Sequence, residues 1–268
     1  MFLLKSPKIG RWTLRQALLT VAAVAVLCRY TLYLRALDDA ESNAAATVRQ
    51  LGGGAEWETH HSLPFLPRQR SCFRVTFCGR LPKSETDFRF LLGMPSVRSL
   101  YLSGIPVTDE QMKMIGRCRL LEFLNIGKAQ ITDVGLRELR NCRKLRDLHC
   151  GNTMIRGRGF NELAGTVPLE KLWTDGSPID DDGMASIAAL PQLRVFEAFS
   201  SSITGVGLKH IAKCRSLEDV FIGGSFSRSD AQCLLDGPRF THIDLVGDGF
   251  REPAYGSFRK LDSVKALP

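Results

Sequence analysis

Residues 121–150 have the sequence LEFLNIGKAQITDVGLRELRNCRKLRDLHC, and the stretch ends by repeating the pattern with which it begins. Leu124 returns as Leu148 and Ile126 returns as Cys150, each 24 residues later. Residues at alternate positions of a strand point to the same side, so each pair predicts a short strand with one buried side. The constant spacing predicts that this strand belongs to a repeated structural unit.

The 24-residue step continues on both sides of this stretch. Three largely apolar columns keep it: Leu100, Leu124, Leu148, Leu172, Phe196 and Val220; Leu102, Ile126, Cys150, Thr174, Ala198 and Ile222; and Val97, Leu121, Leu145, Leu169, Leu193 and Leu217. Phe73 lies 24 residues before Val97, and Phe240 lies 23 residues after Leu217. We therefore expect seven units within residues 73–245, starting at 73, 97, 121, 145, 169, 193 and 217, and a closing strand.

A second segment of each unit carries the signals of a helix start. ITDVGL (131–136) and IDDDGM (179–184) place Thr or Asp where a side-chain oxygen caps the first helical turn. Thr108 and Gln111 match a capping box. Each unit thus predicts one strand and one short helix, which bury their apolar sides only when units stack. The expected fold is an α/β solenoid, a curved parallel sheet with short helices on the convex side.

This repeat resembles the leucine-rich-repeat family, and within it the cysteine-containing type, whose signature is C-x-x-L-x-x-L-x-L followed later by I-T-D-x-G-L. CRKLRDLHC (142–150) and ITDVGL (131–136) carry the resemblance, which covers about two thirds of the chain. Cys118, Cys142 and Cys214 share one column of the repeat. The unit is shorter than the subtype's, and small residues replace the usual Asn or Cys after the strand. This short form looks most like exported or membrane-anchored repeat proteins of bacteria.

The N-terminal 35 residues carry six basic side chains and no acidic one. An apolar run covers residues 17–28, Arg29 interrupts it, and TLYL extends it to Leu34. We expect a membrane segment within residues 14–35, as a signal-anchor helix with the repeat domain on the non-cytoplasmic side. A cleaved secretory signal and a mitochondrial transit peptide are the competing interpretations.

The net charge of +8 lies mostly in that N-terminus, because the remaining 233 residues carry 30 basic and 28 acidic side chains. A near-neutral body argues against a nucleic-acid partner. The sequence has no P-loop, HExxH, GxSxG or CxxC motif, so we expect no enzyme, cofactor or metal site. Asp180, Asp181 and Asp182 stand at a helix start, which favours capping over Ca²⁺ binding. The cysteine column suits structural burial.

The flanking segments have less regular sequences. Residues 36–56 are expected to be a helical juxtamembrane linker ending in the flexible glycine triplet 52–54. Residues 57–72 are expected to form an N-terminal cap and 246–268 a C-terminal cap. The candidate packing anchors of these caps are Trp57, Phe65, Leu66, Phe250, Tyr255 and Phe258.

The residues between the inward positions of each strand point out of the opposite side of the sheet. There the sequence mixes aromatic residues with isolated charges, a composition typical of interface hot spots. The predicted partner-binding residues are Tyr101, Phe123, Asn125, Asp147, His149, Lys171, Trp173, Glu197 and Phe221. Packing of these side chains against the flanking segments, or against a second copy of the chain, is the alternative.

Together these patterns predict a membrane-anchored scaffold that binds a protein or peptide on its concave face. One alternative is the substrate receptor of an F-box-type ubiquitin ligase, because the cysteine-containing repeats resemble those attached to F-box proteins. No F-box-like helical module precedes the repeats here. A second alternative is a mitochondrial assembly factor, which requires the N-terminus to be a cleaved transit peptide. The oligomeric state is open.

Overall fold

The computed structural model describes residues 14–60, 69–77, 88–199, 202–235 and 240–248. In these residues a single nine-stranded sheet follows chain order. The strands are β1 (Gly53–His60), β2 (Gln69–Phe77), β3 (Ser99–Tyr101), β4 (Phe123–Asn125), β5 (Asp147–His149), β6 (Lys171–Trp173), β7 (Val195–Ala198), β8 (Asp219–Gly223) and β9 (His242–Val246). The helices are α1 (Leu14–Gln50), η1 (Arg89–Gly93), α2 (Asp109–Ile115), α3 (Asp133–Leu136), η2 (Arg137–Asn141), η3 (Arg158–Glu162), α4 (Asp181–Ala188), α5 (Gly205–Ile211) and α6 (Arg228–Leu235).

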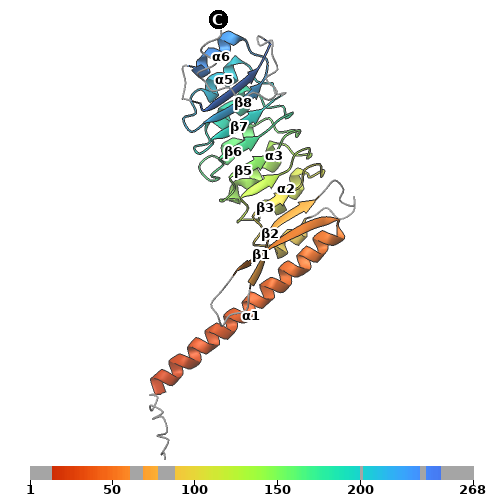
Figure 1. The fold of residues 1–268 in the computed structure, drawn as a ribbon, viewed down its shortest axis with the longest axis vertical. Helices are drawn as coiled ribbons and strands as arrows, with labels where there is room; N and C mark the ends of the chain where they lie inside the picture. The colour runs from red at the N-terminus through yellow and green to blue at the C-terminus, as the bar shows by residue number, and fades with distance from the viewer. Residues whose placement is uncertain (1–13, 61–68, 78–87, 200–201, 236–239, 249–268) are drawn as a thin grey trace, which may run out of the picture.

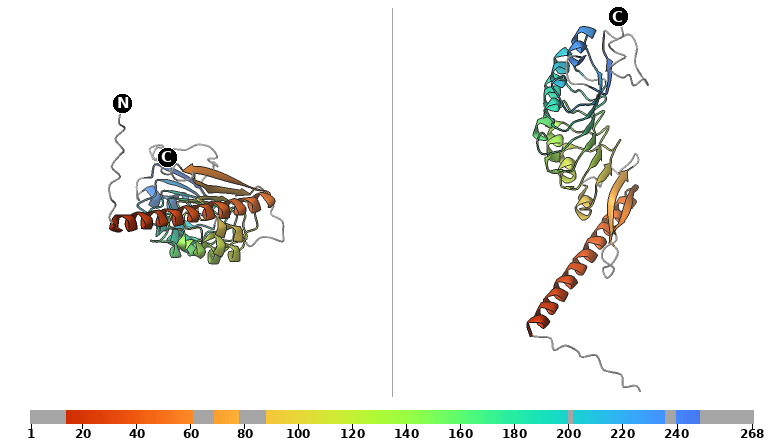
Figure 2. Two further views of the ribbon diagram at one scale, coloured as in Figure 1. Left: turned by 90° about the horizontal axis from the view of Figure 1, so that it is seen from below. Right: turned by 60° about the vertical axis from the view of Figure 1, so that its left-hand side comes forward.

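Strands β2 to β9 pair in parallel, each with the next along the chain. Leu124 lies opposite Leu148 and Leu148 opposite Leu172, so the 24-residue step is the register of the sheet. The side chains of this column are completely buried. The sheet lines one side of a curved rod and the short helices line the other, as Figure 2 shows. The predicted solenoid is therefore confirmed in its strands, register and inward columns.

The closing strand is confirmed as well. Strand β9 pairs with β8 so that Ile243 lies opposite Val220, which is the shorter step of 23 residues. Phe240 and Ile243 are both buried. The proposed C-terminal packing anchors Phe250, Tyr255 and Phe258 lie outside the described residues.

The opening unit differs from the prediction. Val75, not Thr76, lies opposite Leu100, so β2 is one residue out of the 24-residue step. Phe73 is therefore not equivalent to Val97. It stays partly exposed, whereas Val75 and Phe77 are buried. The physical reason is that β2 is held on its other side by an antiparallel hairpin with β1 and not by a preceding repeat.

The segment expected to be a linker is helical, as predicted, but it packs on the solenoid and its glycine triplet is not flexible. Helix α1 continues through residues 36–50 without a break, and Ala44, Ala45, Val48 and Leu51 are buried in the same core as the repeats. The glycine triplet is ordered. Gly52 turns the chain with a φ of 81°, and the other two glycines belong to β1. Residues 36–60 and 69–77 thus form the N-terminal cap, in which Trp57 packs against the core. Phe65 and Leu66 lie outside the described residues.

The N-terminal half of α1 projects away from the solenoid, as Figure 1 shows. Its apolar side chains are exposed; Leu18 is 61% exposed and Val26 is 70% exposed. In the described part of the chain, α1 is the one helix with the length and hydropathy to cross a membrane, and a signal sequence has the same features.

Carboxylates at the helix starts connect consecutive units. Asp109 accepts hydrogen bonds from the backbone N–H groups of Thr132 and Gly135 at 2.8 and 3.0 Å and from the Thr132 hydroxyl at 2.7 Å. Asp181 makes the same three contacts with Thr204 and Gly207 in the following unit. One carboxylate therefore satisfies the free N–H groups of its neighbour's helix start.

Two of the predicted caps are also present. Asp180 accepts a hydrogen bond from the N–H of Gly183 at 2.9 Å, and Gln111 accepts one from the N–H of Thr108 at 2.8 Å. Gly183, the glycine of the helix-start segment 179–184, has a packing role. A Cβ on Gly183 would collide with the carbonyl oxygen of Arg156 in the preceding unit. Close stacking of the units therefore requires glycine there.

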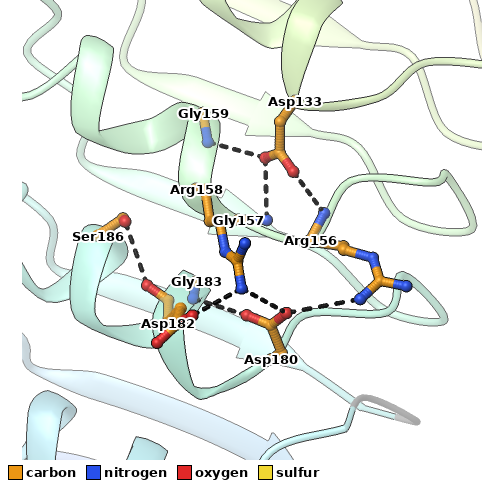
Figure 3. A network of polar contacts seen from close by, with 9 residues as sticks. All are labelled: Asp133, Arg156, Gly157, Arg158, Gly159, Asp180, Asp182, Gly183 and Ser186. Carbon is orange, nitrogen blue, oxygen red and sulfur yellow. Dashed lines mark hydrogen bonds and ion pairs between the residues drawn. The ribbon is translucent and has the colours of Figure 1, made fainter.

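The unit 145–168 lacks this arrangement, because Gly157 stands where the neighbouring units have Asp. Asp133 of the preceding unit still accepts hydrogen bonds from the N–H groups of residues 156, 157 and 159, at 3.1, 3.0 and 2.8 Å. Towards the following unit, Arg158 replaces the missing carboxylate by pairing with Asp182 at 2.6 Å (Figure 3). This contact between the units is exposed, so it contributes little beside the buried apolar columns.

The cysteine column is buried, as expected. Burial raises the pKa of Cys118 and of Cys142 to about 12. Thiols with such pKa values stay protonated at neutral pH, and a protonated thiol is a poor nucleophile and metal ligand. These cysteines are structural residues of the core.

Candidate binding surface on the concave face

All nine predicted partner-binding residues lie at outward positions of strands β3 to β8. Lys171 is exposed and the other eight are partly buried, because neighbours on the same sheet cover one another. The core does not contain them, so the inward–outward assignment from the sequence is confirmed. Their binding of a partner stays a prediction.

Four of these side chains form a continuous stack, here called the aromatic ladder: Tyr101, Phe123, His149 and Trp173. The ring centroids of Tyr101 and Phe123 are 4.5 Å apart, and those of Phe123 and His149 are 5.2 Å apart. His149 and Trp173 are 3.9 Å apart and only 17° from parallel. Adjacent strands lie about 4.8 Å apart, which is close to the distance at which rings stack. The ladder therefore follows from placing rings on four consecutive strands.

His149 joins the ladder as a neutral ring. Burial lowers its pKa, and the nearby carboxylate of Asp147 opposes this only in part. A neutral imidazole stacked on the indole of Trp173 adds apolar surface without adding charge. The ladder thus offers a flat, largely apolar platform across the middle of the sheet.

The guanidinium group of Arg74 lies at the N-terminal end of the ladder. The guanidinium carbon of Arg74 lies 5.7 Å from the ring centroid of Tyr101, within the range of a cation–π contact. Arg74 also pairs with Glu56 on the neighbouring strand at 3.0 Å. Sequence reasoning missed Arg74, because the 24-residue step assigns the opening unit to the wrong register.

A pair of carboxyl groups lies beyond the other end of the ladder. Glu197 is directly opposite Trp173 in the sheet. Burial, a hydrogen bond with Asp175 and the charge of Asp175 raise the pKa of Glu197 to about 7. Asp175 in turn accepts a hydrogen bond from the N–H of Phe199 at 2.8 Å. A carboxyl group with a raised pKa and a second carboxyl group hydrogen-bonded to it therefore lie beside the indole ring.

Asp175 was not among the predicted site residues, because it follows β6 instead of lying within it. A signal was present in the sequence. The same column holds Gly127 and Gly151 in the two preceding units, so a carboxylate there breaks the pattern.

The remaining site residues are engaged with neighbours on the sheet. Asp147 lies 4.0 Å from the ammonium of Lys171. Asp219, an outward residue of β8 that was not among the nine, lies 2.7 Å from Nδ1 of His242. Asn125 accepts a hydrogen bond from the N–H of Gly127 at 3.1 Å, so it shapes its own turn as well as facing outward.

The concave face thus combines an apolar platform with charges at both ends. In the described residues, no three His, Cys, Asp or Glu side chains gather closely enough to hold a metal ion. An arrangement of this kind recognises shape and charge over several strands, as an interface does.

Comparison with known proteins adds little beyond this geometry. No family model matches the chain, and no curated protein matches it. Among solved structures, it is similar to a leucine-rich-repeat protein of Leptospira interrogans, with 18% identity and a TM-score of 0.42. The match covers 55% of this chain and 36% of that one, so the chain spans about a third of that protein. The solenoid assignment depends on the repeat and the sheet of this chain.

Proposed function

We propose that this protein is a membrane-anchored interaction scaffold whose concave face binds a polypeptide. The aromatic ladder is the observation that carries the proposal. Rings on an exposed sheet are costly to leave in water, and the side chains of this sheet cover them only in part. A partner that lies across the strands would complete their burial.

The anchoring part of the proposal is supported by α1. Its apolar side chains between residues 18 and 33 are exposed to solvent, and basic residues precede them in the sequence. A bilayer would bury these side chains, and the charge distribution favours a cytoplasmic N-terminus. The repeat domain would then lie on the non-cytoplasmic side, held by residues 14–35.

Site-specific photo-crosslinking tests the scaffold proposal. A photoreactive phenylalanine analogue replaces Trp173 in one version of the full-length chain and Val134 in another, both expressed in the native cell. Val134 is a matched control, because it is apolar, 59% exposed and located in α3 on the helical side. We expect a discrete crosslinked partner from position 173 and none from position 134. Equal labelling from both positions, or crosslinks only between copies of this chain, would contradict the proposal.

Fractionation with protease treatment tests the anchor separately. A membrane-bound chain whose repeats are cleaved only from the non-cytoplasmic side is the expected result. A soluble cytoplasmic chain would favour the ubiquitin-ligase alternative. A shortened chain inside mitochondria would favour the assembly-factor alternative.

A further inference from the structure

The charge of the solenoid is divided along its length. Residues 73–146 carry 14 basic and 7 acidic side chains, whereas residues 147–248 carry 9 basic and 14 acidic ones. The first half therefore has a net charge of +7 and the second half a net charge of −5. The helix α1 packs against β1, β2 and η1, so the basic half is the one beside the helix.

Part of this basic charge is neutralised in an ordered way. The residue just before each of the strands β3 to β8 alternates between Arg and Glu from unit to unit. Arg146 pairs with Glu170 at 2.6 Å, and Arg194 pairs with Glu218 at 2.7 Å. Pairing between neighbouring units is therefore available to this solenoid wherever the opposite charge is placed one unit away.

Another group of cations in the basic half has no such pairing. They lie on the helices and turns of two consecutive units, and here they are called the basic flank: Arg117, Arg119, Arg137, Arg140, Arg143 and Lys144. All six are exposed, and none of their side chains forms an ion pair or hydrogen bond with a residue that the structure describes. Arg119 and Arg143 occupy the same column of adjacent units, which places two like charges side by side.

The flank is confined to these units. In the next two units the columns of Arg117 and Arg119 hold Gly165 and Val167, then Ala189 and Pro191. Unpaired like charges in adjacent units repel each other and favour the binding of an anion. The flank lies in the two units that follow the unit packed on α1, because η1 contacts α1 and α2 contacts η1. This position near the membrane helix indicates which anion.

We infer that the basic flank binds the anionic phospholipid headgroups of the bilayer that α1 enters. The inference rests on the membrane anchoring proposed above. The axis of α1 is oblique to the row of strands (Figure 1), so a helix inserted near the bilayer normal leaves the solenoid leaning, with its first units nearest the lipid. Lys and Arg side chains near an anionic surface are attracted to it, and the attraction fades within a Debye length of about 8–10 Å.

The chain contains a matched control for this inference. Lys213 and Arg215 occupy the same two columns as Arg117 and Arg119, four units further from α1. At about 4.8 Å per strand, these units are separated by about 19 Å along the sheet, roughly twice the Debye length. Charge reversal of either pair changes the net charge equally.

The test uses the full-length chain in nanodiscs, one set of phosphatidylcholine alone and one with one third phosphatidylglycerol. Deuterium uptake of the turns at residues 116–121 and 140–145 is the readout. We expect slower uptake in the anionic discs at low salt, and loss of this protection in 1 M salt. Inorganic phosphate added to neutral discs is expected to give no protection, which separates a bilayer from a free anion.

The variant R117E/R119E is expected to abolish the protection, while K213E/R215E is expected to leave it unchanged. Far-ultraviolet circular dichroism checks that both variants fold, and R140E/R143E serves as a second test of the flank. Uptake that is the same in neutral and anionic discs would overturn the inference, as would equal effects of the proximal and distal pairs. A chain that does not remain in the discs would instead overturn the anchoring proposal.

Discussion

Leu148 and His149 are neighbours in β5, yet they belong to the two opposite faces of the sheet. Leu148 is fully buried between equivalent leucines of the units before and after it. His149 faces the concave side and stacks on Trp173. The inward face repeats nearly the same residue type in every unit, whereas the concave face changes residue from unit to unit. This difference shows which positions the stacking of units restricts and which it leaves available for binding.

The largest expected effect is on the inward face. Leu148→Ala removes a fully buried side chain from a close-packed interior, so we expect the free energy of unfolding to fall by about 2–5 kcal/mol. Chemical denaturation of the detergent-solubilised chain measures it. A change near zero would mean that the 24-residue register does not define the core.

A smaller loss is expected at the helix starts. Asp133→Ala removes three hydrogen bonds that connect two units and leaves backbone N–H groups unsatisfied, which is expected to cost about 2 kcal/mol. Asp182→Ala is the control, because the Asp182 side chain is 73% exposed and exposed ion pairs contribute little. If both variants lose equal stability in the same denaturation experiment, the carboxylate does not hold the units together.

A still smaller, pH-dependent effect is expected on the concave face. The raised pKa of Glu197, about 7 against 4.5 for a free carboxyl, means that the folded chain holds a proton that the unfolded chain releases. Stability therefore falls as the pH rises from 4.5 to 7. The side chain of the Glu197→Gln variant does not titrate in this range, so the variant lacks this loss of stability. It should be more stable than the wild type by about 1 kcal/mol at pH 7.5, after allowance for solvent screening, and similar at pH 4.5.

Thermal melts of both chains between pH 4.5 and pH 7.5 measure this difference. Parallel pH profiles for wild type and variant would show that the pKa of Glu197 is not raised in the folded chain.

A similarly small effect on stability is expected for Trp173→Ala, about 0.5–1.5 kcal/mol, because the side chain lies outside the core and its removal costs the stacking on His149. In contrast, the variant should no longer crosslink to the partner when the photoreactive phenylalanine analogue replaces Phe123, the ladder residue two strands away. A destabilisation as large as that of Leu148→Ala would place Trp173 in the core and remove the distinction between the two faces.

The failures of sequence reasoning fall where the repeat stops. The predicted register of Phe73 was wrong because the antiparallel pairing with β1 determines the position of β2. That pairing does not follow the 24-residue spacing, so the sequence does not reveal it. The helix within residues 36–56 was predicted, but its packing was not, because Ala44, Ala45 and Val48 are too small and few to indicate a buried helix side. The inter-unit role of Asp181 was missed because its partner residues belong to the next unit.

The amino-acid sequence by itself determined the solenoid, its inward columns, the helix starts and the outward position of the nine candidate residues. These features can be predicted because the 24-residue period gives the length of each unit and aligns the inward and outward positions of its strand with those of the next unit. Only the tertiary structure decided that α1 caps the first unit, that four rings stack into a ladder, and that Asp175 adjoins Glu197. It also separated the paired cations from the unpaired ones. These features depend on distances between side chains of different units, and such distances are set by stacking and not by position along the chain.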